Sequence, residues 1–210
     1  MHISEGVLAA PVLIGGAALA LAGTAVGLKR LDEHEVPKAA VLTATFFVAT
    51  LVHVPLGPAS IHLVLNGLVG LLLGWACFPA ILVALLLQAL FFQYGGLTVL
   101  GVNTVIMALP ALLCFLALSP LVRRRGPISA AAAFLTGALA ILGAGALAAL
   151  ALALSGEAFI PAAKTLLAAH VPIMVLEGLL TTVIVGFLIK VRPELLDPSR
   201  QPRQTESDRP

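Results

Sequence analysis

The feature that most constrains this chain is a long stretch without formal charge: residues 39–122 contain no Asp, Glu, Lys or Arg. Of all 210 residues, 60% are apolar and 10% are charged, whereas about 25% are charged in an ordinary soluble domain. A soluble fold of this length would leave much of that apolar surface in contact with water. We therefore expect an integral membrane protein, which excludes a soluble enzyme and a disordered chain. The net charge of +2 also offers no basic field for nucleic acid.

Charged residues, Pro and Gly divide the apolar sequence into stretches close to the roughly 20 residues that cross a bilayer as a helix. The pattern predicts an all-α bundle of about seven transmembrane helices, with six as the alternative, at residues 7–28, 39–55, 60–77, 79–94, 97–122, 128–154 and 166–190. Residues 1–196 are expected to form one transmembrane domain, and the polar residues 197–210 a disordered cytoplasmic tail. Cys77 and Cys114 lie in separate apolar runs, which favours two core thiols over a disulfide.

The basic residues predict the orientation, because Lys and Arg accumulate in cytoplasmic loops. With the N-terminus outside and the C-terminus inside, Lys164 is the one external residue among the 12 Lys and Arg. Small residues also recur at helical spacing within residues 16–27 and 137–149. Such faces allow close helix packing, either within the chain or against a partner membrane subunit.

The predicted orientation divides the histidines into two groups. His34 falls in a cytoplasmic loop, whereas His2, His53, His62 and His170 gather at the outer side. Titratable groups are costly near membrane depth, so four imidazoles on one side indicate a transition-metal site. Taken singly, His2 is also explained by accidental placement at a frayed terminus, and His62 by a bond to backbone at a helix start. Structural hydrogen bonding is the default explanation for His53 and His170.

His2 is the most specific element of this group. A free α-amine, the amide nitrogen of residue 2 and its imidazole can close two fused chelate rings on one ion, a geometry suited to Ni²⁺ or Cu²⁺. One more imidazole would complete four donors, and His62 is the candidate because it follows the turn at residues 57–60. The expected ligands are therefore Met1, His2 and His62.

Other polar residues in the apolar stretches are expected to hydrogen-bond between helices, Glu177 with a neighbouring helix among them. Asn103 and Gln93 flank the turn at Gly95-Gly96, and with His53 and His170 they are candidates for orienting a metal ligand from outside its coordination sphere. Catalysis is not expected, since the chain has no HExxH, GxxxxGK[ST] or GxSxG motif.

Four stretches together resemble the substrate-binding (S) component of cobalt/nickel energy-coupling-factor (ECF) transporters, the CbiM/NikM family: MHISEG at residues 1–6, GPASIHL at 57–63, GGLT with GVN at 95–103, and HVP, EG and KVRPEL between residues 170 and 195. The resemblance implies that the Met1 amine, the backbone nitrogen and imidazole of His2, and His62 bind the ion.

The resemblance also implies Co²⁺ or Ni²⁺ as the transported substrate, with no organic cofactor. The implied partners are a membrane T component, cytoplasmic ATPase subunits and a small auxiliary membrane subunit, in a bacterial or archaeal plasma (inner) membrane. No nucleic acid is expected. The alternatives are a stand-alone metal channel or secondary carrier and, more distantly, an intramembrane hydrolase. A carrier is expected to show a polar path or paired broken helices, and the cytoplasmic halves of the predicted spans are nearly all apolar.

Overall fold

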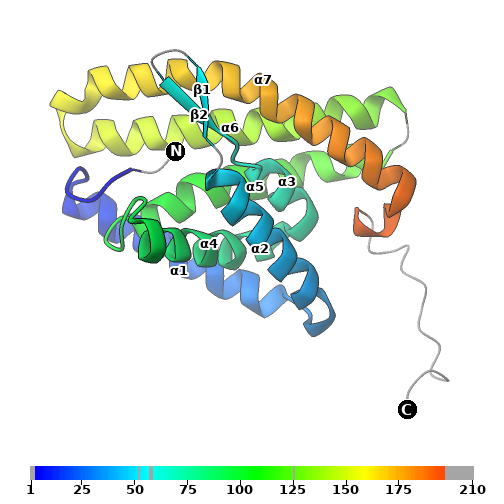
Figure 1. The fold of residues 1–210 in the computed structure, drawn as a ribbon. Coiled ribbons are helices and arrows are strands. Elements are labelled where there is room, and N and C mark those ends of the chain that lie inside the picture. Colours follow the sequence, from blue (N-terminus) through cyan, green and yellow to red (C-terminus); the bar gives the residue numbers. More distant parts are fainter. Residues whose placement is uncertain (1–2, 52, 57–58, 125, 197–210) are drawn as a thin grey trace.

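The computed structural model describes residues 3–51, 53–56, 59–124 and 126–196. These residues form an all-α bundle into which one short hairpin is inserted (Figure 1). The α-helices are α1 (Ala10–Arg30), α2 (Val36–Leu51), α3 (Asn66–Leu73), α4 (Cys77–Phe92), α5 (Leu100–Val122), α6 (Pro127–Ser155) and α7 (Ile160–Val191). The hairpin consists of β1 (His53–Leu56) and β2 (Ala59–His62), and the 3-10 turns are η1 (Glu33–Glu35), η2 (Gly74–Ala76), η3 (Glu157–Phe159) and η4 (Pro193–Leu195).

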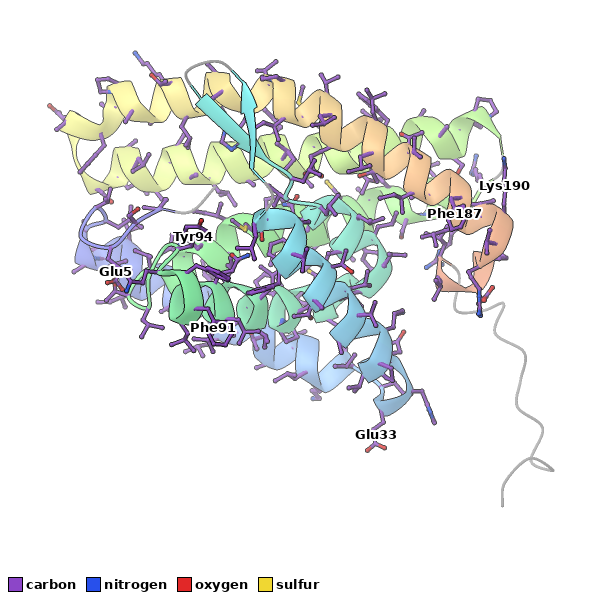
Figure 2. The ribbon with its side chains drawn as sticks, viewed as in Figure 1. Glu5, Glu33, Phe91, Tyr94, Phe187 and Lys190 are labelled. Atoms are coloured by element: carbon purple, nitrogen blue, oxygen red, sulfur yellow. The ribbon has the colours of Figure 1, made fainter. Side chains whose placement is uncertain are left out.

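The prediction of a multi-pass membrane protein is confirmed. Within the described part of the chain, 5 helical stretches are long and apolar enough to cross a bilayer: Ala10–Arg30, Asn66–Phe92, Leu100–Val122, Pro127–Ser155 and Glu157–Val191. α2 has 16 residues and α3 has 8, so each is shorter than a full helical span. Large apolar side chains point outward, as Phe91 (68% exposed) and Phe187 (61% exposed) do in Figure 2. Such side chains suit contact with lipid tails.

α5 is the central helix, since it contacts α1, α3, α4 and α6. α6 and α7 lie side by side as a long antiparallel pair along one side of the bundle, and α1, α2 and α4 lie on the other side (Figure 1). Gly16, Gly23 and Gly27 of α1 and the three glycines of α6 are covered by the chain itself; a Cβ at Gly27, for example, would lie 2.6 Å from the carbonyl oxygen of Trp75. The small-residue faces therefore serve packing within the chain. Cys77 and Cys114 are free and buried, as predicted.

The stretch Asn66–Phe92 reverses direction in its middle. Along α3, the contact partners on α5 advance toward the end of α5: Asn66 with Met107, Gly70 with Ala111, and Gly74 with Phe115. The chain then turns in η2, where Gly74 has a φ of 55°, a left-handed value that favours glycine. After the turn, the Cys77 thiol lies 3.7 Å from the carbonyl oxygen of Ala108, two turns back along α5. α3 is therefore parallel to α5, and α4 is antiparallel to it.

We call the end of the bundle where α1, α5 and α7 begin the N-terminal end. There the Ala9 N–H donates to the Ser155 hydroxyl at the end of α6 (3.1 Å), and the Glu5 N–H donates to the Gly95 carbonyl between α4 and α5 (3.1 Å). The leading segment of the chain therefore lies against the α4–α5 loop and the end of α6.

At the opposite end, the Arg30 guanidinium lies 5.0 Å from the centroid of the Trp75 ring in η2. Arg123, after α5, donates from Nε to the Leu196 carbonyl after η4 (3.1 Å). The last residues of α1, α5 and α7 and the η2 turn therefore lie together at this end of the bundle.

The helices expected at residues 39–55 and 60–77 have different boundaries in the structure. α2 ends at Leu51, residues 53–56 pair with residues 59–62 as antiparallel strands, and α3 begins only at Asn66. Pro55 disfavours helical backbone at the residue before it, so the first helix ends early. The late start of α3 coincides with a tertiary contact, because a carboxylate on α7 accepts hydrogen bonds from the two residues just before α3.

Candidate metal-binding site

The hairpin brings two of the predicted site residues together. His53 and His62 are directly opposite each other in the β1–β2 register. The backbone of both residues is described, and their side chains lie outside the described part of the structure. Met1 and His2 also lie outside the described residues, so their role as ligands stays a prediction. The structure describes the residues that follow them.

The residue that follows His2 is held by a side chain of α5. The Ile3 N–H donates to Asn103 Oδ1 (3.1 Å), and Asn103 Nδ2 donates to the Ile3 carbonyl (3.1 Å). Ile3 and Asn103 are both buried, at 9% and 2% exposure. Because both hydrogen bonds join the same two residues inside the protein, they fix the direction of the chain immediately after His2. Asn103 was predicted to support the site, and this pairing is the contact through which it can do so.

Glu5 provides a second attachment of the same segment. Its Oε1 accepts hydrogen bonds from the Thr98 N–H (2.9 Å) and the Thr98 hydroxyl (3.2 Å). The backbone hydrogen bond from Thr98 is the main reason that the pKa of Glu5 lies below its ordinary value. Gly96 lies directly against the Glu5 side chain, where a Cβ would be 2.1 Å from the Glu5 Cγ. Figure 2 shows Glu5 at the N-terminal end, on the same side of the molecule as Tyr94.

A buried carboxylate lies beyond the hairpin, at Glu177, for which the sequence predicted only a contact with a neighbouring helix. Glu177 of α7 has 0% exposure, and its carboxylate accepts hydrogen bonds from the backbone N–H groups of Val64 and Leu65. The next residue, Asn66, donates from Nδ2 to the carbonyl oxygens of Met107 (3.0 Å) and Ala140 (3.4 Å). The start of α3 is therefore attached to α5, α6 and α7 by polar contacts inside an apolar bundle.

Comparison with known proteins identifies the family. Residues 2–195 match the model of the CbiM family, described as the cobalt uptake substrate-specific transmembrane region. The chain belongs to the CbiM family. A protein of Haemophilus influenzae that is named for metal transport is 43% identical over 94% of this chain and 97% of its own length. The fused nickel transport protein NikMN of Rhodobacter capsulatus is 32% identical over 98% of this chain and 67% of its own length.

The fold agrees with this assignment. The crystal structure of a transition metal transporter superposes with a TM-score of 0.77 at 25% identity, and the match covers 91% of this chain and 93% of that one. The protein is thus a membrane component of cobalt or nickel transport, which agrees with the expectation of transport rather than catalysis.

The other predicted supporting residues of this CbiM family member lie in different surroundings. Gln93 is exposed, at the end of α4. His170 is buried in α7, where its Nδ1 lies 2.5 Å from the Leu166 carbonyl oxygen, so that nitrogen carries the proton. His34 is exposed in η1 at the opposite end. Among the described residues, no three His, Cys, Asp or Glu side chains form a cluster that could hold a metal ion.

Proposed function

We propose that the protein is the substrate-binding S component of an ATP-driven ECF-type uptake transporter and captures Co²⁺ or Ni²⁺ at the outer face of the plasma membrane. The observation that carries the proposal is the double hydrogen bond between Ile3 and Asn103. A frayed N-terminus needs no such attachment, whereas a chelating N-terminus has to be held in one place. Family membership supports the choice of metal.

The proposed ligands are the Met1 amine, the amide nitrogen and imidazole of His2, and the His62 imidazole. Four nitrogen donors in this arrangement favour square-planar coordination, which suits Ni²⁺ and is compatible with Co²⁺. The hydrogen bonds at Ile3 and Glu5 support the three N-terminal donors, because they fix the backbone of the residues that follow these donors. Asn103 is the proposed supporting contact.

The proposed topology has seven crossings, with the N-terminus outside. α3, together with the extended residues before it, forms the third crossing, and α4 forms the fourth because the chain reverses at η2. Lys29, Arg30, Lys38 and Arg123 lie at the opposite end, whereas Lys164 lies near the start of α7. This distribution supports a cytoplasmic opposite end and an external N-terminal end.

The proposed partners are a membrane T component, cytoplasmic ATPases and an auxiliary membrane subunit. The sequence has no GxxxxGK[ST] motif to bind ATP phosphates, so energy for uptake has to come from another chain. If the purified protein alone transported the ion into liposomes without an ATPase, a secondary carrier would replace this proposal.

The deciding experiment is metal analysis and calorimetric titration of the full chain, purified with a native, untagged N-terminus. We expect one high-affinity site for Ni²⁺ or Co²⁺ per chain. A protein that binds neither ion, or binds Mg²⁺ equally well, would contradict the proposal.

A further inference from the structure

Glu177 is the acidic residue that the structure buries most completely, and it lies within the apolar helix α7. Its Oε1 accepts from the N–H groups of Val64 (2.5 Å) and Leu65 (3.0 Å), and its Oε2 accepts from Leu65 (3.1 Å). A carboxylate in such surroundings is costly unless hydrogen bonds compensate it, so this arrangement requires a reason.

The first reason is local. Leu65 is the N-cap of α3 and has a left-handed φ of 55°, so the helix begins abruptly. The first N–H groups of any helix lack partners within the helix, and inside a membrane no water replaces them. The Glu177 carboxylate supplies acceptors for the N–H groups just before α3.

The second reason is the position of this contact along the chain. One residue, Leu63, separates Val64 from His62, the last residue of β2. Two residues of extended chain span at most about 7 Å, so a fixed Val64 restricts His62 to a small region. On its other side the hairpin follows α2. This helix is attached to α4, because Gln88 of α4 donates hydrogen bonds to the Thr50 hydroxyl and the Phe47 carbonyl of α2.

We propose that Glu177 is a positioning residue that sets the place of His62 in the metal site by anchoring the backbone at Val64 and Leu65. This inference rests on the proposed function, because it concerns the fourth ligand of that site. Glu177 acts only through the backbone and does not itself bind the ion. The start of α3 is thereby coupled to α7, so the hairpin that carries His62 is held to the bundle at that point.

The test measures Ni²⁺ affinity by calorimetry and the Ni²⁺ absorption spectrum for the full, untagged chain. Glu177→Ala is expected to lower affinity by about 10–100-fold, the usual cost of losing a residue that supports a metal ligand. Its spectrum is expected to match that of His62→Ala, since both proteins keep the three N-terminal donors. Glu177→Gln is expected to recover much of the affinity, because the amide oxygen still accepts a backbone hydrogen bond.

Two further comparisons separate positioning from a general loss of structure. If Glu177 acts through His62, the double variant Glu177→Ala/His62→Ala binds no more weakly than His62→Ala alone. The matched control is Thr181→Val, one turn further along α7, since the Thr181 hydroxyl is buried without a hydrogen-bond partner among the described residues. This control is expected to bind as the wild type does.

A last variant covers the case in which Glu177→Ala does not fold. Insertion of one alanine between Leu63 and Val64 keeps the Glu177 contacts and displaces His62, so it is expected to lose as much affinity as His62→Ala. Wild-type affinity in the insertion variant or in Glu177→Ala would overturn the inference, as would full additivity in the double variant. Failure of the proposed function is recognised separately, because then the wild type shows no high-affinity binding or His62→Ala has no effect.

Discussion

The side-chain amide of Asn103 gives Ile3 both hydrogen bonds that a neighbouring β-strand would give, although the two residues are 100 positions apart in the sequence. The contact ties the beginning of the chain to the central helix of the bundle. It therefore connects the proposed N-terminal chelate to a helix that packs against α1, α3, α4 and α6.

Replacing Asn103 by Leu is expected to weaken metal binding. The variant leaves the buried N–H and C=O groups of Ile3 without partners, at a cost of about 1–3 kcal/mol for each group, so residues 1–3 move away from α5. We expect affinity for Ni²⁺ to fall about 10–100-fold in a calorimetric titration. The control is Gln93→Ala, at an exposed position, which is expected to keep wild-type affinity. Equal affinities in all three proteins would exclude a supporting role for Asn103.

Much of the bundle could be predicted from sequence, because hydropathy and helix-breaking residues act locally. α6 was expected at residues 128–154 and is found at Pro127–Ser155, where Pro127 begins the helix and Gly156 follows it. The division between the third and fourth helices near Cys77 was also predicted, and the turn is η2 at Gly74–Ala76.

The start of α3 could not be predicted in the same way. Residues 60–65 are as apolar as the helix that follows, and a helical pattern fits them equally well. Residues 59–62 form a strand instead, and the N–H groups of Val64 and Leu65 donate to Glu177, which is 112 positions from Leu65 and provides acceptors that the local sequence lacks. Likewise, Asn103 was recognised as a candidate from its place beside the Gly95-Gly96 turn, but its partner Ile3 was not identified.

The proposed orientation predicts opposite labelling of two engineered cysteines in intact cells. Lys164→Cys, near the start of α7, is expected to react with a membrane-impermeant maleimide, whereas Glu33→Cys, in η1, is expected to react only after the membrane is opened. Figure 2 shows Glu33 at the end of the molecule opposite Glu5. The native thiols of Cys77 and Cys114 are buried and should contribute little background. Labelling of Glu33→Cys from outside would reverse the topology and contradict uptake from the N-terminal end.

Metal affinity is expected to depend steeply on pH. The amine, amide and imidazole nitrogens must all lose protons to bind, so the bound state carries fewer protons and acid favours the free state. Between about pH 7.5 and 5.5, across the histidine reference value of roughly 6.5, affinity should fall strongly in the wild type. His62→Ala should show a shallower slope, because it has one fewer imidazole to deprotonate. Affinity that does not change over this range would exclude nitrogen ligation.

The Glu5–Thr98 contact makes a separate prediction about a carboxyl group outside the membrane-spanning helices. The pKa of Glu5 is lowered in the folded protein, chiefly by the Thr98 N–H, so the contact is fully present above the ordinary value of 4.5 and is lost as pH falls through the lower folded value. An NMR titration of the Glu5 carboxyl carbon is expected to give a pKa below 4.5 in the wild type. Gly96→Ala, which displaces the Glu5 side chain, should return the pKa toward 4.5. Gly15→Ala, where a Cβ meets nothing within 4 Å, is the matched control and should leave the titration unchanged.

The N-terminal amine is the donor that distinguishes a chelate from a cluster of histidine side chains. Acetylation removes the free amine, and one residue added before Met1 converts the Met1 amine, the proposed donor, into an amide, while every side chain remains. We expect either change to abolish high-affinity binding of Ni²⁺ and Co²⁺ in calorimetric titration.

Two substitutions complete this experiment. His62→Ala is expected to lose substantial affinity because the fourth donor is gone, whereas His34→Ala, exposed at the opposite end, should bind as the wild type does. A site made of the side chains of His2, His53, His62 and His170 would tolerate both N-terminal changes, since each imidazole keeps its lone pair. Wild-type affinity in the extended protein would therefore rule out the chelate, and equal losses in His34→Ala and His62→Ala would rule out a site at the N-terminal end.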